Sequence, residues 1–433
     1  MNVNASSVRA YAAMPSYYAS SANPAPDRIA LKGSHSFDIC IVGGGFTGLS
    51  AALELVQRGF SVAIVEDQRV GFGASGRNGG QLINGYSRPL DFLAAKLGED
   101  RARDLASVAL EGSAIIRERV ARFGIACDLV DRSAVVALTP KQMRWLEGQA
   151  AVWASYGHPG MQMIEGDGLQ QIVSSHRYVG AMVDPLGGHF HPLNYVLGEA
   201  AAFEAMGGRI FENSRVLKIT EGARPMIETA QGCMTCDTLL LCGNAYLGDA
   251  KPELTARIMP VSSQVVTTEP LGGLAEELLP ANTCVEDANY ILDYFRRTAD
   301  GRILFGGGVV YGGGDPASIE GRILPGLLKT FPQLRGVRLD HAWSGKFALT
   351  LNRMPQIGRL SSNVWFSHGD SGHGVTTTQL LGRLLSEAIG GQMERFDIFA
   401  SLPHYPFPGG RHFRVPLTIL GSLWYAMRDR LGL

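Results

Sequence analysis

Three glycines near the start of the chain have the spacing of a dinucleotide-binding turn. Gly43, Gly45 and Gly48 lie in VGGGFTGLS, between an apolar run, DICIV, and a segment of helical periodicity, LSAALELVQRG. In such a turn the first glycine permits a tight bend, the second lets a pyrophosphate approach the backbone, and the third lets helix and strand pack closely. The free N–H groups at the helix N-terminus then favour the phosphates. We therefore predict a phosphate site that includes the next two helical residues, Phe46 and Thr47.

An acidic residue completes this pattern. Glu66 ends SVAIVE, which reads as the second strand of a βαβ unit. A carboxylate in this place accepts hydrogen bonds from ribose hydroxyls, and it repels a 2′-phosphate, which argues against NADP. The pattern predicts binding of NAD or FAD and does not separate the two.

A second glycine-rich segment favours flavin. GASGRNGGQ, residues 73–81, follows where a nicotinamide-nucleotide domain normally continues with another strand and helix. Its glycines let backbone N–H groups lie against a flat or charged ligand, whereas the alternative is a flexible surface loop. We expect the cofactor to be lined by Ser75, Arg77, Asn78, Gly79, Gly80 and Gln81.

A third segment, HGDSGHGVTTTQLLGRLLSEAI, presents another helix N-terminus behind a glycine turn. Such a terminus stabilises negative charge on a bound ring. Reduced flavin carries that charge near N1 and the C2 carbonyl, and nicotinamide does not. His373 either donates a hydrogen bond there, as a catalytic residue, or serves only in the helix cap.

The motifs VGGGFTGLSAALEL, GASGRNGGQ, ILFGGG, WSGKFALTLNRMPQIGRL and GHGVTTTQLLGRLLSEAI occur in this order. They resemble the successive motifs of the D-amino-acid-oxidase-like superfamily of FAD oxidoreductases, and within it the gamma-glutamylputrescine oxidase group. The resemblance extends from about residue 16 to the C-terminus. It implies that the first three glycines and Glu66 bind the ADP half of FAD. It also implies an adenine contact through the backbone of Val216, a turn near the pyrophosphate at Gly243 and Asn244, and a flavin carbonyl end formed by Gly372, His373, Gly374, Val375 and Thr376.

The sequence differs from relatives in this superfamily at two places, which bear on how FAD is attached and on the class of substrate. Some relatives attach FAD through a late cysteine or an early-loop histidine, but here no cysteine follows Cys284 and no histidine occurs from residue 36 to 157. Noncovalent FAD is therefore expected. Relatives that oxidise simple amino acids often carry an arginine before the proline that corresponds to Pro355, where this chain has Phe347 beside Lys346. The absence of a carboxylate clamp favours an amine substrate over a free amino acid.

Flavin-dependent amine oxidation relies on orientation and desolvation, because the α C–H bond must lie near flavin N5. An aromatic pocket is therefore expected in the second domain, although each aromatic candidate also suits a core or surface position. Lys346 is the candidate for promoting oxygen reduction by its positive charge, or else it is a solvated lysine. Oxidase and dehydrogenase both stay open. The candidate substrate contacts are Tyr290, Tyr294, Phe295, Tyr311 and Phe347.

A chain of 433 residues favours two connected domains. The expected fold class is α/β, with a discontinuous Rossmann-like FAD-binding domain and an inserted mixed-sheet α+β substrate domain. The FAD-binding segments are 37–88, 186–250 and 349–400, and the substrate segments are 89–185 and 251–348. An N-terminal arm, 1–36, and a C-terminal extension, 401–433, complete the chain.

The net charge and the cysteine content limit the kinds of partner and the cellular location that can be expected. A net charge of -1 gives no basic surface for nucleic acid. Six scattered cysteines predict reduced thiols and a cytoplasmic protein. The single CxxC motif, residues 233–236, is predicted to form a turn that enters a strand, and not a metal site. No apolar run reaches the roughly 18 residues of a membrane span. The apolar C-terminal stretch VPLTILGSLWYAM predicts a docked helix, with peripheral membrane contact as the alternative.

The leading functional hypothesis is oxidation of a primary amine, such as a gamma-glutamyl-capped polyamine, to an imine and then to an aldehyde and ammonia. Oxygen or a respiratory acceptor takes the electrons. The alternatives are oxidation of a secondary amine or imino acid such as pipecolate or sarcosine, and a non-catalytic flavin-binding protein. The sequence gives no oligomeric state.

Overall fold

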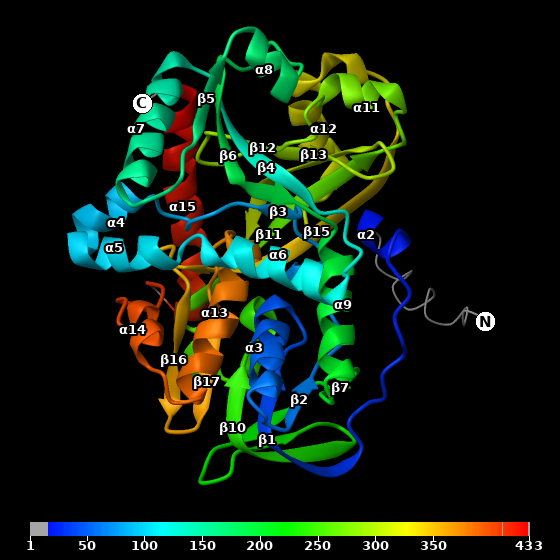
Figure 1. The fold of residues 1–433 in the computed structure, drawn as a ribbon, viewed down its shortest axis with the longest axis vertical. Coiled ribbons are helices and arrows are strands. Elements are labelled where there is room, and N and C mark those ends of the chain that lie inside the picture. The colour runs from blue at the N-terminus through cyan, green and yellow to red at the C-terminus, as the bar shows by residue number, and fades with distance from the viewer. Residues whose placement is uncertain (1–15, 409, 432–433) are drawn as a thin grey trace.

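Two mixed sheets organise the computed structural model, which describes residues 16–408 and 410–431 (Figure 1). The first sheet has the order β16-β17-β10-β1-β2-β7, and β8 and β9 extend it beside β10. Its central strands β17, β10, β1, β2 and β7 are parallel. The bounds are β1 Gly33–Val42, β2 Val62–Val65, β7 Arg209–Phe211, β8 Lys218–Thr220, β9 Met226–Glu228, β10 Gly232–Leu241, β16 Gln356–Ser361 and β17 Val364–His368.

Helices α3 (Phe46–Gln57) and α13 (Gly374–Ile389) pack side by side over this sheet (Figure 1). Two glycines make these approaches possible. An ideal Cβ on Gly48 would lie 2.1 Å from the Gly43 carbonyl oxygen, and one on Gly382 would lie 2.5 Å from Ser50 Cβ. The apolar runs of the sequence therefore form a core in which α3 lies close to β1 and α13 lies close to α3.

Helix α6 (Glu111–Phe123) belongs to the same layer through a buried arginine. Arg119 donates from Nη1 to Glu199 on α9 (Pro192–Ala205) at 2.9 Å and to Gln379 on α13 at 2.6 Å. From Nη2 it donates to Glu54 on α3 at 3.0 Å. The prediction that placed all of 89–185 in the substrate domain is therefore wrong for α6, because its buried charge is neutralised only by the helices of the first sheet.

The second sheet has the order β15-β11-β14-β13-β12-β4-β6-β3, with β5 beside β6. Gln81 of β3 pairs with His189 of β6, so the chain enters this sheet before residue 88 and leaves it after residue 185, contrary to the expected boundaries. The bounds are β3 Gln81–Leu82, β4 Val130–Ala137, β5 Gln162–Glu165, β6 Gly180–His189, β11 Ile258–Thr268, β12 Cys284–Asp287, β13 Tyr294–Arg297, β14 Ile303–Tyr311 and β15 Leu339–Thr350.

Further helices cover the second sheet and the junction between the sheets. A distinct apolar core lies between α8, α11, α12 and the second sheet and is centred on Phe295, Phe305 and Phe331. The remaining helices are α2 Tyr17–Ser20, α4 Leu90–Leu97, α5 Glu99–Val108, α7 Pro140–Ser155, α8 Asp167–Ile172, α10 Pro252–Thr255, α11 Gly273–Leu278, α12 Ile319–Thr330, α14 Glu394–Ala400 and α15 Gly410–Leu431.

The C-terminal helix α15 is held to the body by Arg414, which donates to the carbonyl oxygens of Thr255 and Ile258 at 2.9 and 2.8 Å. Its outer side exposes Phe413 and Leu420. No helix in the part of the chain that the structure describes is long and apolar enough to cross a membrane. Peripheral membrane contact stays a prediction.

The N-terminal segment packs into the interior. Tyr18 is fully buried, and its hydroxyl accepts a hydrogen bond from Arg296 Nη2 at 3.0 Å. The same guanidinium donates from Nε to the Gly79 carbonyl oxygen at 2.8 Å, while Tyr17 donates to Asp300 at 2.9 Å. Residues 1–15 of the expected arm lie outside the described residues. Helix α2 is mostly buried and connects the second sheet to the 73–81 loop through Arg296.

Candidate functional site

A cavity of about 830 Å³ opens between the two sheets and is lined by residues of both. This volume is in the range of small-molecule and cofactor sites. The cavity brings together most of the residues selected from the sequence. Those that line it are Gly43, Gly45, Phe46, Thr47, Glu66, Ser75, Arg77, Asn78, Gly79, Gln81, Val216, Gly243, Asn244, Tyr290, Tyr294, Tyr311, Lys346, Phe347, Gly372, His373, Gly374 and Val375.

Four selected residues lie behind the cavity wall. Gly48 packs on the Gly43 carbonyl, and Gly80, with a φ of 70°, packs under the Phe190 carbonyl. Thr376 donates to the Ile83 carbonyl oxygen at 2.8 Å. Phe295 stacks on a core phenylalanine and is wholly buried. The prediction that Gly80, Thr376 and Phe295 contact ligands is therefore corrected: they support the wall, because each is already occupied by protein atoms.

The N-terminus of α3 faces the cavity as the glycine spacing predicts. Gly43 has a φ of 113°, and its ideal Cβ would lie 2.7 Å from the Cys242 carbonyl oxygen, so a side chain is excluded. The half-buried Glu66 accepts hydrogen bonds from the N–H groups of Gly44 at 2.7 Å and Gln68 at 3.0 Å. Burial raises the pKa of Glu66 to about 7. Backbone and carboxylate therefore converge where a nucleotide would enter.

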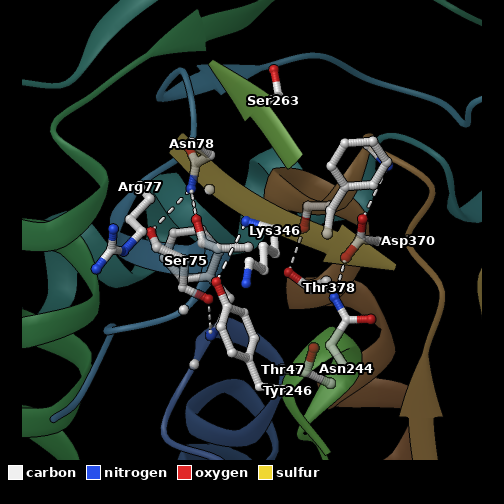
Figure 2. A pocket seen from close by; sticks show the side chains of 18 of the residues that line it. Thr47, Ser75, Arg77, Asn78, Asn244, Tyr246, Ser263, Lys346, Asp370 and Thr378 are labelled. Atoms are coloured by element: carbon white, nitrogen blue, oxygen red, sulfur yellow. Dashed lines mark hydrogen bonds between the residues drawn. The ribbon is translucent and has the colours of Figure 1, made fainter. Parts of the chain in front are cut away.

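The polar side chains of the 73–81 loop mainly hold the loop itself. Ser75 Oγ accepts from Phe46 N at 2.9 Å. Asn78 donates to the carbonyl oxygens of Ala74 and Ser75, both at 3.0 Å, and its Oδ1 accepts from Gly80 N at 2.8 Å. Figure 2 shows Asn78 folded back over Ser75. The loop is therefore ordered by its own amide and hydroxyl groups, and Gly79, which has no side chain, lines the cavity.

Arg77 joins this loop to the second sheet. Its Nε donates to the Phe72 carbonyl oxygen at 2.8 Å and its Nη1 to that of Ser344 at 3.3 Å, while the guanidinium lies 4.8 Å from the centre of the Phe72 ring. Trp343 Nε1 donates to the Arg77 carbonyl oxygen at 2.9 Å. Burial lowers the pKa of Arg77. The side chain thus acts by fixing the loop position.

At the N-terminus of α13, a buried carboxylate organises the glycine turn. Asp370 accepts from Asn244 Nδ2 at 2.6 Å and from Gly372 N at 3.0 Å, and burial raises its pKa. Figure 2 shows Asn244 and Asp370 facing each other. His373 makes no side-chain cap bond, its buried Nδ1 has no hydrogen-bond partner in the described structure, and burial lowers its pKa to about 4. A neutral imidazole with a spare nitrogen therefore lies in the cavity wall.

The second sheet supplies the opposite wall. The Tyr294 ring lies 2.7 Å from an ideal Cβ on Gly79, so only glycine fits beneath it. Lys346 donates from its backbone N to Tyr246 Oη at 3.4 Å, and Figure 2 shows its side chain projecting into the cavity beside Tyr246. Its ammonium group has no hydrogen-bond or ion-pair partner within residues 16–408 and 410–431. A positive charge and aromatic rings therefore lie across the cavity from the 73–81 loop.

Several lining residues escaped sequence reasoning. Asp370 and Tyr246 lie within two residues of predicted site residues, Gly372 and Asn244, so these neighbours were a usable signal. Glu286 and Arg353 are charged residues that belong to no recognisable sequence motif. Arg353 has a left-handed φ of 65° and donates to Tyr290 Oη at 2.8 Å. An arginine thus reaches the cavity two residues before Pro355, although the aligned place expected for one holds Phe347.

The arrangement fits FAD on the chemistry of its donors. Glycines whose Cβ atoms would clash lie at a helix N-terminus, the Glu66 carboxylate lies beside them, and the unpartnered Nδ1 of His373 lies at a second helix N-terminus. The aromatic and cationic wall then faces the same loop. The cavity can hold a dinucleotide along α3 and a second small molecule against the wall.

Comparison with known proteins agrees with this geometry. The family model described as FAD dependent oxidoreductase matches residues 38–388. The chain is 52% identical over 96% of its length to Escherichia coli gamma-glutamylputrescine oxidoreductase, of which it covers 98%. It is 39% identical over 91% of its length to a probable oxidoreductase of Haemophilus influenzae, of which it covers 92%.

Solved structures confirm the predicted fold class. Glycine oxidase from Geobacillus kaustophilus superimposes with a TM-score of 0.68 at 22% identity, over 82% of this chain and 95% of that one. L-alpha-glycerophosphate oxidase from Mycoplasma pneumoniae, solved with FAD bound, gives a TM-score of 0.66 at 15% identity, over 87% and 97% of the two chains. The chain therefore belongs to the D-amino-acid-oxidase-like family of FAD-dependent oxidoreductases.

Proposed function

We propose that the protein oxidises the terminal primary amine of a gamma-glutamyl-capped diamine, with gamma-glutamylputrescine as the reference substrate. The imine product is hydrolysed by water to an aldehyde and ammonia. The observation that carries this proposal is the 52% identity, over nearly the full length of both chains, to the gamma-glutamylputrescine oxidoreductase of Escherichia coli. The cavity supports it with an aromatic wall for an alkyl chain and with Arg353, whose guanidinium suits a carboxylate at the capped end.

FAD, when bound, supplies the acceptor for the electron pair of the amine's α C–H bond. The chain's own residues hold and orient the reactants. We propose that the N-terminus of α3 binds the phosphates, that Glu66 binds the ribose, and that the 73–81 loop receives the ring system without a covalent bond. Tyr294 and Phe347 would exclude water beside the reacting carbon, which strengthens every polar contact there.

His373 and Lys346 have separate proposed roles. The neutral His373, at the N-terminus of α13, would donate a hydrogen bond toward the pyrimidine end of the ring, where negative charge develops. Lys346 would stabilise superoxide during reoxidation, which favours oxygen over a respiratory acceptor as the electron sink. We also propose a cytoplasmic location, which the six free cysteines support.

The alternative is oxidation of a secondary amine or imino acid such as pipecolate or sarcosine, which Arg353 also suits because both substrates carry a carboxylate. Anaerobic reduction of the purified flavoprotein separates the candidates. We expect gamma-glutamylputrescine to bleach the flavin bands faster than putrescine, pipecolate, sarcosine or D-amino acids. Fast bleaching by pipecolate alone would overturn the assignment. Hydrogen peroxide formed in air, measured with the productive substrate, identifies the acceptor.

A further inference from the structure

Glu286 is a carboxylate in the cavity wall that the reactions described above do not use. It lies on β12, where it pairs across the sheet with Tyr294 of β13. Its neighbour Val285 is wholly buried in the apolar core of the second sheet. Because side chains alternate along a strand, the core takes Val285 and the cavity takes Glu286.

The carboxylate of Glu286 lacks a counter-charge. It makes no ion pair and no hydrogen bond in the described structure. The adjacent Asp287 differs: it lies 3.7 Å from the guanidinium of Arg177 and accepts from Asn289 N at 3.1 Å. Burial, together with the charge of Asp287, raises the pKa of Glu286 to about 7. An unpaired, half-buried carboxylate is unfavourable for the fold, which points to a partner that arrives from outside.

The position of Glu286 in the cavity is fixed by two contacts of its neighbours. Tyr294, its cross-strand partner, lies over Gly79. The carbonyl oxygen of Val285 accepts from Gln81 Nε2 at 3.1 Å. Gly79 and Gln81 both belong to the loop that receives the ring of the cofactor. Glu286 therefore lies at the reacting end of the cavity.

The groups in the cavity wall beside Glu286 favour one kind of ligand. Tyr294 offers an aromatic face, and the charge beside it is negative, which suits a primary ammonium on an alkyl chain. The connection that follows β12 carries Tyr290, which holds Arg353, so the same cavity also has a positive group for an anionic end. We propose that Glu286 binds the ammonium group of the amine substrate and so selects amines that arrive as cations. This inference rests on the proposed function.

A thermodynamic cycle tests this contact. Wild type and Glu286→Gln are compared with gamma-glutamylputrescine and with its analogue in which a hydroxyl replaces the terminal ammonium. The affinity for gamma-glutamylputrescine comes from saturation of the anaerobic reduction rate. The affinity for the hydroxyl analogue comes from its competition with gamma-glutamylputrescine in the same assay. We expect Glu286→Gln to weaken binding of the amine about 10- to 100-fold and to change binding of the hydroxyl analogue little, because only a charged partner is lost.

Two further variants guard against a loss of folding. Glu286→Asp keeps the charge and is expected to keep the preference for the amine over the hydroxyl analogue. Glu165→Gln, at an exposed carboxylate of β5 in the same sheet, serves as the control and is expected to match wild type. Flavin content and melting temperature are recorded for each variant.

The outcomes separate the two proposals. If gamma-glutamylputrescine reduces the wild-type flavin, and Glu286→Gln binds this amine with the same affinity as wild type, the role of Glu286 is overturned and the proposed function stands. An equal loss for amine and hydroxyl analogue also overturns it, because that result indicates a general distortion of the wall. If no amine reduces the flavin of the wild-type protein, the proposed function is overturned, and the role of Glu286 is overturned as well.

Discussion

Ser75 accepts a hydrogen bond from the backbone N–H of Phe46 at 2.9 Å, although the two residues belong to different segments of the site. Phe46 opens α3, and Ser75 lies in the 73–81 loop. An ideal Cβ on Gly45 would lie 2.8 Å from the same hydroxyl oxygen. The glycine turn before α3 and the 73–81 loop are therefore one unit, joined through the first turn of a helix.

Ser75→Ala should weaken FAD retention. The substitution removes an acceptor at the start of α3, and such a loss costs about 1 kcal/mol, or a five- to tenfold weaker affinity. Flavin release measured by ultrafiltration or fluorescence checks this. Ser107→Ala, at an exposed serine of α5, provides the matched control. Equal retention in both variants would show that the Ser75 contact is dispensable.

Arg77→Ala should also weaken retention, but by loosening the loop from the second sheet. The guanidinium bridges the carbonyl oxygen of Phe72 and that of Ser344, which lies on β15 of the second sheet. Arg77→Lys is expected to restore little, because an ammonium cannot reproduce the planar fork that reaches both carbonyls. Proteolysis of the loop is expected to quicken in both variants. Full flavin occupancy with unchanged turnover in Arg77→Ala would remove Arg77 from the site.

Lys346→Gln should slow flavin reoxidation by oxygen more than it slows anaerobic reduction by substrate. The ammonium is a positive charge that faces the cavity with no partner among the described residues, and removing it should cost about tenfold or more in the oxygen reaction. Lys346→Arg keeps the charge and should retain most of the rate. Stopped-flow mixing of reduced enzyme with oxygen measures the step. A wild type that reacts as slowly as Lys346→Gln would be a dehydrogenase.

The stability of the flavin-free protein should depend on the ionisation of Glu66. Burial raises its folded-state pKa from 4.5 to about 7. The carboxyl therefore contributes stability below pH 4.5 that is lost as pH rises through 7. We expect the Tm of the flavin-free protein to fall relative to that of Glu66→Gln as pH increases from 4.5 to 7.5. A constant difference in Tm between the two proteins would contradict this.

Arg119→Met should strongly destabilise the first layer. Arg119 and Glu199 are both wholly or almost wholly buried, so removing the guanidinium leaves an uncompensated carboxylate, which costs about 3–5 kcal/mol. Arg122→Met, on the same helix, is the control, since Arg122 is exposed and its 3.5 Å pair with Glu118 is worth less than about 1 kcal/mol. Denaturant unfolding of the flavin-loaded proteins compares them. Similar midpoints would show that Glu199 becomes neutral without cost.

The sequence predicted those parts of the site that depend on backbone geometry. Gly43 and Gly45 are recognisable because only glycine fits where they lie, and that requirement is visible in a short spacing. Side-chain roles were harder to predict. Asn78 was predicted to contact the cofactor, yet its amide is used within its own loop, since local hydrogen bonds compete for asparagine.

Charges that reach the site from distant segments could not be found in this way. Glu286 and Arg353 line the cavity through strand alternation and a left-handed turn, and neither feature leaves a pattern in the neighbouring residues. The boundary between the two sheets was missed for a similar reason. Strand β3 has two residues, and its pairing with β6 depends on partners about a hundred positions away.

The buried α2 segment also sets an order for assembly of the protein. Tyr17 and Tyr18 leave the ribosome well before their partners Asp300 and Arg296, which follow 283 and 278 residues later. Contacts of such long sequence separation form late in folding. The α2 segment must therefore wait, with the rings of its tyrosines uncovered, until residues near 300 have been synthesised, and chaperone binding to this segment would protect it from aggregation in the meantime.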